Sequence, residues 1–98
     1  MSTHRHVVVR GRVQGVGYRA WAERAALSRG LTGWVRNRRD GSVEAVFIGE
    51  EDAVAAMVEA CRAGPAGAFV DTLDQRDANP GEVRLRRPDE LFSVLATA

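Results

Sequence analysis

The apolar and polar positions of this chain change period several times along its length. Residues 6–13 contain consecutive valines, which is typical of a buried strand. Gly15 and Gly17 then interrupt the apolar pattern, and residues 19–29 contain good helix formers with alanines gathered on one face. Gly30 follows, a residue suited to end a helix. The beginning of the chain is therefore predicted to form a strand, a glycine loop and a helix.

A β-hairpin is predicted in the middle of the chain. The apolar runs at residues 31–37 and 42–48 have the length of strands, and Asp40-Gly41 lies between them. An Asp-Gly pair between two such runs is a strong short-range signal for antiparallel strands joined by a tight turn. The pattern leaves open whether about two or four residues form the centre of that turn.

A second helix is predicted over residues 50–63, because apolar side chains recur there at the i, i+3, i+4 and i+7 positions of one face. These side chains are Val54, Met57, Val58 and Cys61. Cys61 is therefore expected to be an inert part of the core. Beyond this helix the pattern predicts a strand over residues 69–77, a turn at 79–81 and a short final strand over 91–95.

The order of these elements predicts an α+β fold. Strand, helix, strand, strand, helix and strand correspond to two βαβ crossovers joined by a hairpin. This arrangement is the ferredoxin-like βαββαβ sandwich, a four- to five-stranded antiparallel sheet with both helices on one face. At a length of 98 residues the chain is expected to form a single domain over residues 1–98.

Composition excludes several classes of chemistry. All 14 basic residues are arginine, so the chain has no lysine for a Schiff base or a Walker-type phosphate loop. Cys61 is the single cysteine, which excludes an intramolecular disulfide and a thiolate-rich metal site. His4 and His6 have no third ligand at a useful spacing, so no metal is expected. The net charge of +1 gives no strong attraction to nucleic acid or membranes, and without a signal or spanning segment the expected location is the cytoplasm.

The glycine loop before the first helix is the main candidate for a ligand site. The first amides of a helix have no acceptor within the helix, and the helix dipole favours an anion there. Gly15 and Gly17 allow a sharp turn and a close approach to a ligand. Arg19 follows them with a guanidinium that suits phosphate or carboxylate. The alternative is an ordinary strand-to-helix turn whose glycines serve packing.

The same loop formally matches a dinucleotide-binding motif. Residues 15–20 have the pattern G-x-G-x-x-A, and Asp40 lies at a suitable distance for a ribose contact. In a dinucleotide-binding fold, however, the second strand is parallel to the first and is followed by another crossover helix. Here that strand leads directly into the predicted hairpin, so the interpretation is rejected and Asp40 is expected to be a turn residue.

Two segments resemble the signatures of a known family. Residues 11–19, GRVQGVGYR, closely resemble the first signature of the acylphosphatase family. Residues 33–37, GWVRN, followed by DGSV at 40–43, are similar to the second. The resemblance is strong over residues 6–48. The family commonly has Phe at the position of Tyr18, and many members have a more aromatic C-terminal strand than FSVLATA.

The resemblance implies hydrolysis of acyl phosphates to a carboxylate and inorganic phosphate by a positioned water, with no cofactor, metal or covalent intermediate. It identifies Arg19 and Asn37 as the catalytic residues. Arg19 would stabilise charge on the phosphoryl oxygens, and Asn37 would orient the attacking water. The phosphate-binding residues would be Gln14, Gly15, Val16, Gly17, Tyr18 and Arg19, chiefly through their main-chain amides. The protein is expected to be a monomer, and its expected partners are a small acyl phosphate and inorganic phosphate, as product or competitive ligand.

Two other functions stay open from the sequence. An RNA-binding module can have the same order of strands and helices, but it needs aromatic side chains on its first and third strands. Phe47 is the only aromatic residue in those segments, so no nucleic acid partner is expected. A non-catalytic phosphate-binding domain, such as a detached relative of the acylphosphatase-like domain of larger carbamoyl-transfer enzymes, would use the same loop.

Overall fold

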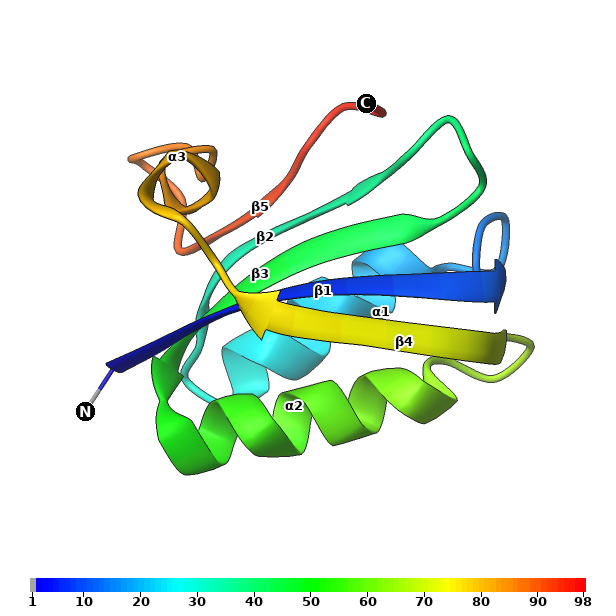
Figure 1. Cartoon of the computed structure of the whole chain (residues 1–98), viewed down its shortest axis with the longest axis horizontal. Coiled ribbons are helices and arrows are strands. Elements are labelled where there is room, and N and C mark those ends of the chain that lie inside the picture. Colours follow the sequence, from blue (N-terminus) through cyan, green and yellow to red (C-terminus); the bar gives the residue numbers. More distant parts are fainter. Residues whose placement is uncertain (1) are drawn as a thin grey trace.

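Figure 1 shows a five-stranded sheet with two long helices packed against one face. The computed structural model describes residues 2–98. The strands are β1 (Ser2–Arg12), β2 (Thr32–Asn37), β3 (Val43–Glu50), β4 (Phe69–Asp77) and β5 (Phe92–Val94). The helices are α1 (Tyr18–Ser28), α2 (Glu51–Ala63) and α3 (Pro80–Val83).

The order of strands in the sheet is β4-β1-β3-β2-β5. β1 lies between β3 and β4 and is antiparallel to both, while β2 and β3 form the antiparallel hairpin. α1 connects β1 to β2, and α2 connects β3 to β4. Because both of these helices cover the same face of the sheet, the predicted ferredoxin-like βαββαβ fold is confirmed.

The edge strand β5 departs from the expected antiparallel pairing. It pairs parallel to β2, with Gly33 opposite Phe92 and Val35 opposite Val94. β4 ends at Asp77, which pairs with Arg5 near the start of β1. β2 begins at this same end of the sheet. The segment after β4 therefore enters the sheet from the end at which β2 begins, and β5 runs parallel to β2.

The hairpin turn has neither of the lengths considered from the sequence. The Arg38 amide donates to the Ser42 carbonyl at 2.9 Å, which leaves Arg39, Asp40 and Gly41 as the central residues. The Gly41 amide donates to the Arg38 carbonyl at 3.1 Å, and Gly41 has a φ of 93°, which is the geometry of a three-residue hairpin loop. The Asp40 carboxylate accepts from the Ser42 amide at 2.9 Å, so Asp40 is a turn residue, as predicted.

The hydrophobic core lies between the sheet and the two long helices. Val7 and Val9 of β1 and Phe47 of β3 are buried there. The predicted face of α2 supplies four further buried side chains, Val54, Met57, Val58 and Cys61. Burial raises the pKa of the Cys61 thiol to about 12, in keeping with an inert place in the core.

A short helix, α3, replaces the turn predicted at residues 79–81. The side chain of Asn79 accepts a hydrogen bond of 2.8 Å from the Glu82 amide, and the Glu82 carboxylate accepts one of 2.9 Å from the Asn79 amide. This reciprocal pair is a capping box, and Pro80 begins the helix with a favourable φ. These bonds stabilise one helical turn where the composition indicated only a break.

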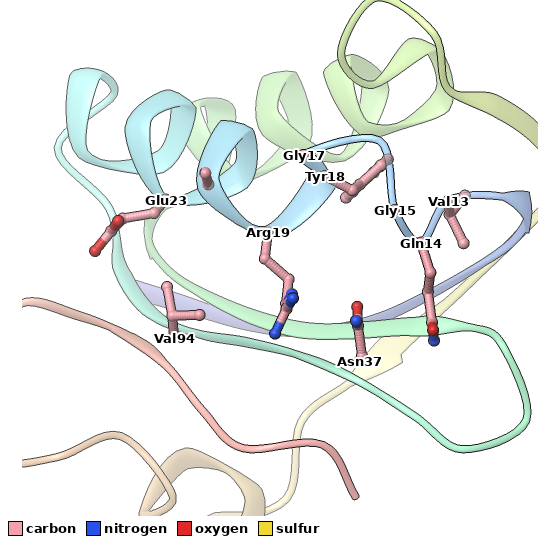
Figure 2. Close-up of a pocket in the computed structure, with 10 residues that line it drawn as sticks. Val13, Gln14, Gly15, Gly17, Tyr18, Arg19, Glu23, Asn37 and Val94 are labelled. Carbon is pink, nitrogen blue, oxygen red and sulfur yellow. The ribbon is translucent and has the colours of Figure 1, made fainter.

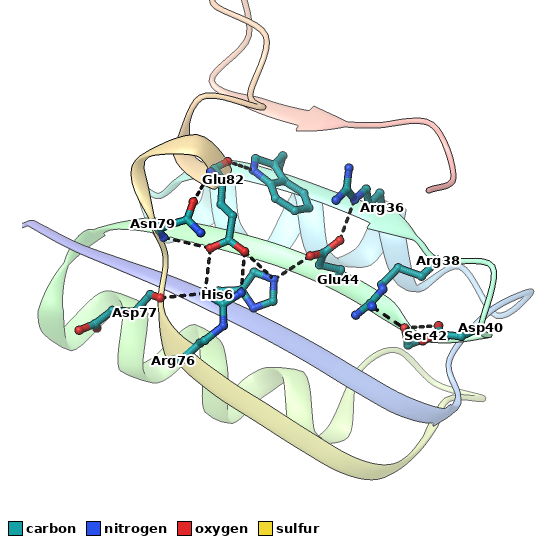
Figure 3. A network of polar contacts seen from close by, with 11 residues as sticks. His6, Arg36, Arg38, Asp40, Ser42, Glu44, Arg76, Asp77, Asn79 and Glu82 are labelled. Carbon is teal, nitrogen blue, oxygen red and sulfur yellow. Dashed lines mark hydrogen bonds and ion pairs between the residues drawn. The ribbon is translucent and has the colours of Figure 1, made fainter.

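An ion-pair network joins α3 to the face of the sheet that the long helices leave open (Figure 3). Nε2 of His6 lies 2.7 Å from a carboxylate oxygen of Glu44 and 3.5 Å from one of Glu82. Arg36 donates to Glu44 at 2.7 Å, and Arg76 donates to Glu82 at 2.6 Å. The hydrogen bond from Arg76 is the main cause that lowers the pKa of Glu82 to about 2.

This network corrects the expectation that His6 has no neighbours suited to a metal. The sheet and α3 bring the ligand atoms of His6, Glu44 and Glu82 within 4.8 Å of one another. Both carboxylates are hydrogen-bonded to arginines, so the cluster is satisfied as an ion-pair network. His4, by contrast, is exposed.

No helix within residues 2–98 has the length and apolar character needed to cross a membrane.

Candidate active site

The loop between β1 and α1 has the sharply turned backbone that its glycines predict. Gly15 and Gly17 have φ values of 75° and 79°, in the left-handed region that favours glycine. A Cβ atom on either residue would meet nothing within 4 Å, so the backbone conformation, rather than crowding, is what requires glycine. Gly17 caps α1, and its carbonyl accepts the Trp21 amide at 3.0 Å.

The amides of this loop and of the first turn of α1 point to an anion site. Within residues 2–98, no protein acceptor receives a hydrogen bond from the amides of Gly15 to Ala20. The first turn of α1 also contains no acidic side chain. Unpaired amides and the positive end of the helix dipole therefore act together at this point, which is the arrangement that binds phosphate groups.

Tyr18 anchors the loop to the rest of the molecule. Its ring is buried, and its hydroxyl donates a hydrogen bond of 2.6 Å to the Cys61 carbonyl of α2. The ring also packs edge-on against Trp21, with 5.2 Å between ring centroids. Burial raises the pKa of the Tyr18 hydroxyl far above its usual range, so this group stays protonated and structural. Any contribution of Tyr18 to ligand binding must come from its main-chain amide.

Arg19 and Asn37 reach the same cavity from different elements (Figure 2). Arg19 extends from the first turn of α1, and its side chain has no hydrogen-bond or ion-pair partner in the described part of the chain. Asn37 is the last residue of β2, and alternation along the strand places it on the same face as the buried Val35. The Asn37 carbonyl accepts the amide of Ala98 at 3.0 Å, so backbone bonds hold this end of β2.

The side chain of Gln14 connects the loop to the hairpin. Its Nε2 donates to the carbonyl oxygens of Arg38 and Ser42, at 2.8 Å each. Both protons of the amide are thereby used within the protein. The sequence indicated a role for Gln14 only through its main-chain amide. Its two acceptors become neighbours only when the hairpin closes, so no local signal indicated this contact.

A cavity of about 350 Å³ brings most of the predicted site together. Asn37 and five of the six predicted phosphate-binding residues line it; those five are Gln14, Gly15, Gly17, Tyr18 and Arg19. The sixth, Val16, is partly buried and packs against the core. Four residues that the sequence did not indicate also line the cavity: Val13, Ala20, Glu23 and Val94. Of these, Glu23 could have been identified, because it follows Arg19 by four residues on the same helix face.

The structure also bears on two of the alternatives considered from the sequence. β2 is antiparallel to its hairpin partner β3, which excludes the dinucleotide-binding arrangement. Phe47, the one aromatic residue of the first and third strands, has no exposed surface and cannot stack on a base.

Comparison with known proteins identifies the family. The model of the acylphosphatase family matches residues 5–86. The chain belongs to the acylphosphatase family. An acylphosphatase of Bradyrhizobium diazoefficiens is 58% identical over 91 residues, which cover 93% of this chain and 92% of that protein.

Solved acylphosphatase structures share this fold over nearly their whole length. The acylphosphatase of Coxiella burnetii has 33% identity and a TM-score of 0.83, covering 96% of this chain and 93% of that one. The acylphosphatase of Bacillus subtilis has 34% identity and a TM-score of 0.82, covering 97% of this chain and 99% of that one. The resemblance seen in two short motifs therefore extends over nearly the whole of this chain.

Proposed function

We propose that this protein hydrolyses acyl phosphates to a carboxylate and inorganic phosphate, with Arg19 binding the phosphoryl group and Asn37 positioning the attacking water. The observation that carries this proposal is the placement of Arg19, the loop amides and Asn37 around one cavity. Family membership assigns the reaction to the chain, and this placement supports the role of each group.

Charge on the phosphoryl oxygens is the first requirement of the reaction. The transferred group carries negative charge on its peripheral oxygens throughout, and preorganised donors stabilise it. The amides from Gly15 onward and the Arg19 guanidinium are such donors, because neither is committed to another group within residues 2–98. A planar guanidinium can bind two phosphoryl oxygens at once.

A positioned water is the second requirement. The side-chain amide of Asn37 can accept a hydrogen bond from a water through its oxygen and donate one to it through its nitrogen, which fixes the orientation of the water without strong basicity. The water oxygen forms a bond to phosphorus while the bond between phosphorus and the acyl oxygen breaks, and both protons of the water stay on the product, which forms as H2PO4−. The leaving group departs as a carboxylate, which is stable without protonation, so no general acid is required.

The oligomeric state of the enzyme and its inhibition by phosphate are proposed from the same site. One chain supplies every group that the mechanism uses, which supports a monomer as the active form. Inorganic phosphate has the same peripheral oxygens as the substrate, so it is expected to compete for the loop. The reaction is proposed to proceed without a metal or a phosphorylated enzyme. The cytoplasmic location stays a prediction.

The proposal is tested with Arg19→Ala, assayed for hydrolysis of benzoyl phosphate. Loss of a preorganised charged donor is expected to lower kcat/KM by about 100-fold or more. Arg24→Ala is the matched control, because Arg24 is an exposed arginine of the same helix. Activity near that of the wild type in a folded Arg19→Ala protein would refute the assignment.

A further inference from the structure

The cavity extends beyond the groups that bind the phosphoryl moiety. Ala20 and Glu23 of α1 and Val94 of β5 line it in addition to the loop, Arg19 and Asn37. Glu23 lies one helical turn after Arg19, and Figure 2 shows it and Val94 at the end of the cavity opposite Gln14 and Gly15. This end therefore has one small apolar side chain, that of Val94, and the carboxylate of Glu23.

The in-line geometry of the displacement places the acyl group at this end of the cavity. In an in-line displacement the leaving oxygen lies on the side of phosphorus opposite the attacking water. With the water at Asn37 and the phosphoryl group at Arg19, the acyl group extends away from Asn37. Figure 2 shows that the cavity continues in this direction toward Glu23 and Val94.

Glu23 brings an uncompensated negative charge to this end. Its side chain is half-buried, and no residue within 2–98 forms an ion pair or a hydrogen bond with it. In Figure 2 the side chain of Arg19, four residues earlier, extends from α1 to a place between Val94 and Asn37, whereas the carboxylate of Glu23 points away from Arg19. A substituent of the acyl group that reaches this end would therefore meet a carboxylate that no arginine within residues 2–98 pairs with.

We propose that Glu23 is a specificity-determining residue that favours acyl phosphates with a cationic acyl group and disfavours those with a second carboxylate. This inference rests on the proposed function and names the substrate class of the same site. Glu23 does not contact the reacting atoms. It acts through the Coulomb interaction with the distal substituent, which is only partly screened in a half-buried position.

The test compares two benzoyl phosphates that differ in the charge of the para substituent. The substrates are 4-(aminomethyl)benzoyl phosphate and 4-carboxybenzoyl phosphate, with 4-methylbenzoyl phosphate as the neutral reference. The readout is the ratio of kcat/KM for the cationic substrate to kcat/KM for the anionic one, because general effects of a substitution cancel in this ratio. One charge pair in such a site changes kcat/KM severalfold, so Glu23→Gln is expected to lower the ratio by about tenfold.

Glu51→Gln is the matched control, since it makes the same change of charge at an exposed position. Glu51 begins α2 at the end of the sheet remote from the loop, where β3 pairs with the start of β1. The control is expected to keep the wild-type ratio. An unchanged ratio in Glu23→Gln, or an equal fall in both variants, overturns the inference about Glu23 alone. Absence of hydrolysis of all three substrates by the wild type contradicts the proposed function instead.

Discussion

The side-chain amide of Gln14 donates a hydrogen bond of 2.8 Å to the carbonyl oxygen of Ser42. A second bond of the same length goes to the Arg38 carbonyl, directly after Asn37. The loop that holds the unpaired amides is thus fastened to the hairpin that holds Asn37. This link sets the position of the loop amides relative to Asn37, although Gln14 itself belongs to the loop.

Gln14→Met is expected to lower kcat for benzoyl phosphate by about tenfold, because small displacements of reacting groups are costly in rate. Methionine keeps the length of the side chain but donates to neither carbonyl. The loop amides remain in place, so KM is expected to change less than kcat. Gln75→Met, at an exposed position of β4, serves as the control. A kcat equal to that of the wild type would show that the link does not position Asn37.

Tyr18→Phe is expected to lower the free energy of unfolding by about 1–2 kcal/mol, because it removes the hydroxyl that donates to the buried Cys61 carbonyl. The aromatic ring, which fills the space between α1 and α2, is kept. Equilibrium unfolding in urea measures the difference. Unchanged stability would mean that this short hydrogen bond contributes nothing net, despite its burial.

Glu82 makes the stability of the fold dependent on pH in the acid range. Hydrogen bonding to Arg76 is the main cause that lowers the pKa of Glu82 from its ordinary value of 4.5 to about 2 in the folded protein. The lowered value means that the folded state favours the ionised form. The stabilisation is therefore complete above about pH 4.5 and is lost as the pH falls toward 2.

Urea unfolding between pH 2 and pH 6 tests this dependence. The free energy of unfolding is expected to fall with acidification in the wild type and to fall less in Glu82→Gln. Glu44, whose pKa is also lowered, chiefly by the hydrogen bond with His6, still contributes in that variant. Glu59→Gln, which changes an exposed pair on α2, is the control. Identical slopes in wild type and Glu82→Gln would contradict the ion-pair account.

The sequence predicted those parts of the fold that depend on local patterns. The valine run of β1, the glycine loop and the apolar face of α2 each have a period that indicates one element type. Gly33 could be recognised only as part of a motif. The structure supplies its physical reason, because a Cβ there would lie 1.8 Å from the Val46 carbonyl oxygen of the adjacent strand.

The parts that the sequence did not predict depend on residues far apart in the chain. The parallel pairing of β5 depends on where β4 ends, and the contact between Gln14 and Ser42 requires the hairpin turn to be closed. The cluster of His6, Glu44 and Glu82 unites two strands and a short helix. No spacing rule within one element could have indicated these contacts.

Arg19 and Asn37 are proposed to divide the work of the site between phosphate binding and water positioning, and Asn37→Ala separates the two roles. The measurement combines kcat for benzoyl phosphate with the dissociation constant of inorganic phosphate, determined by calorimetry on the same preparation. We expect kcat to fall by about 100-fold while phosphate affinity stays within about threefold, because only the attacking water loses its partner. A large loss of phosphate affinity with little change in kcat would contradict this division of roles.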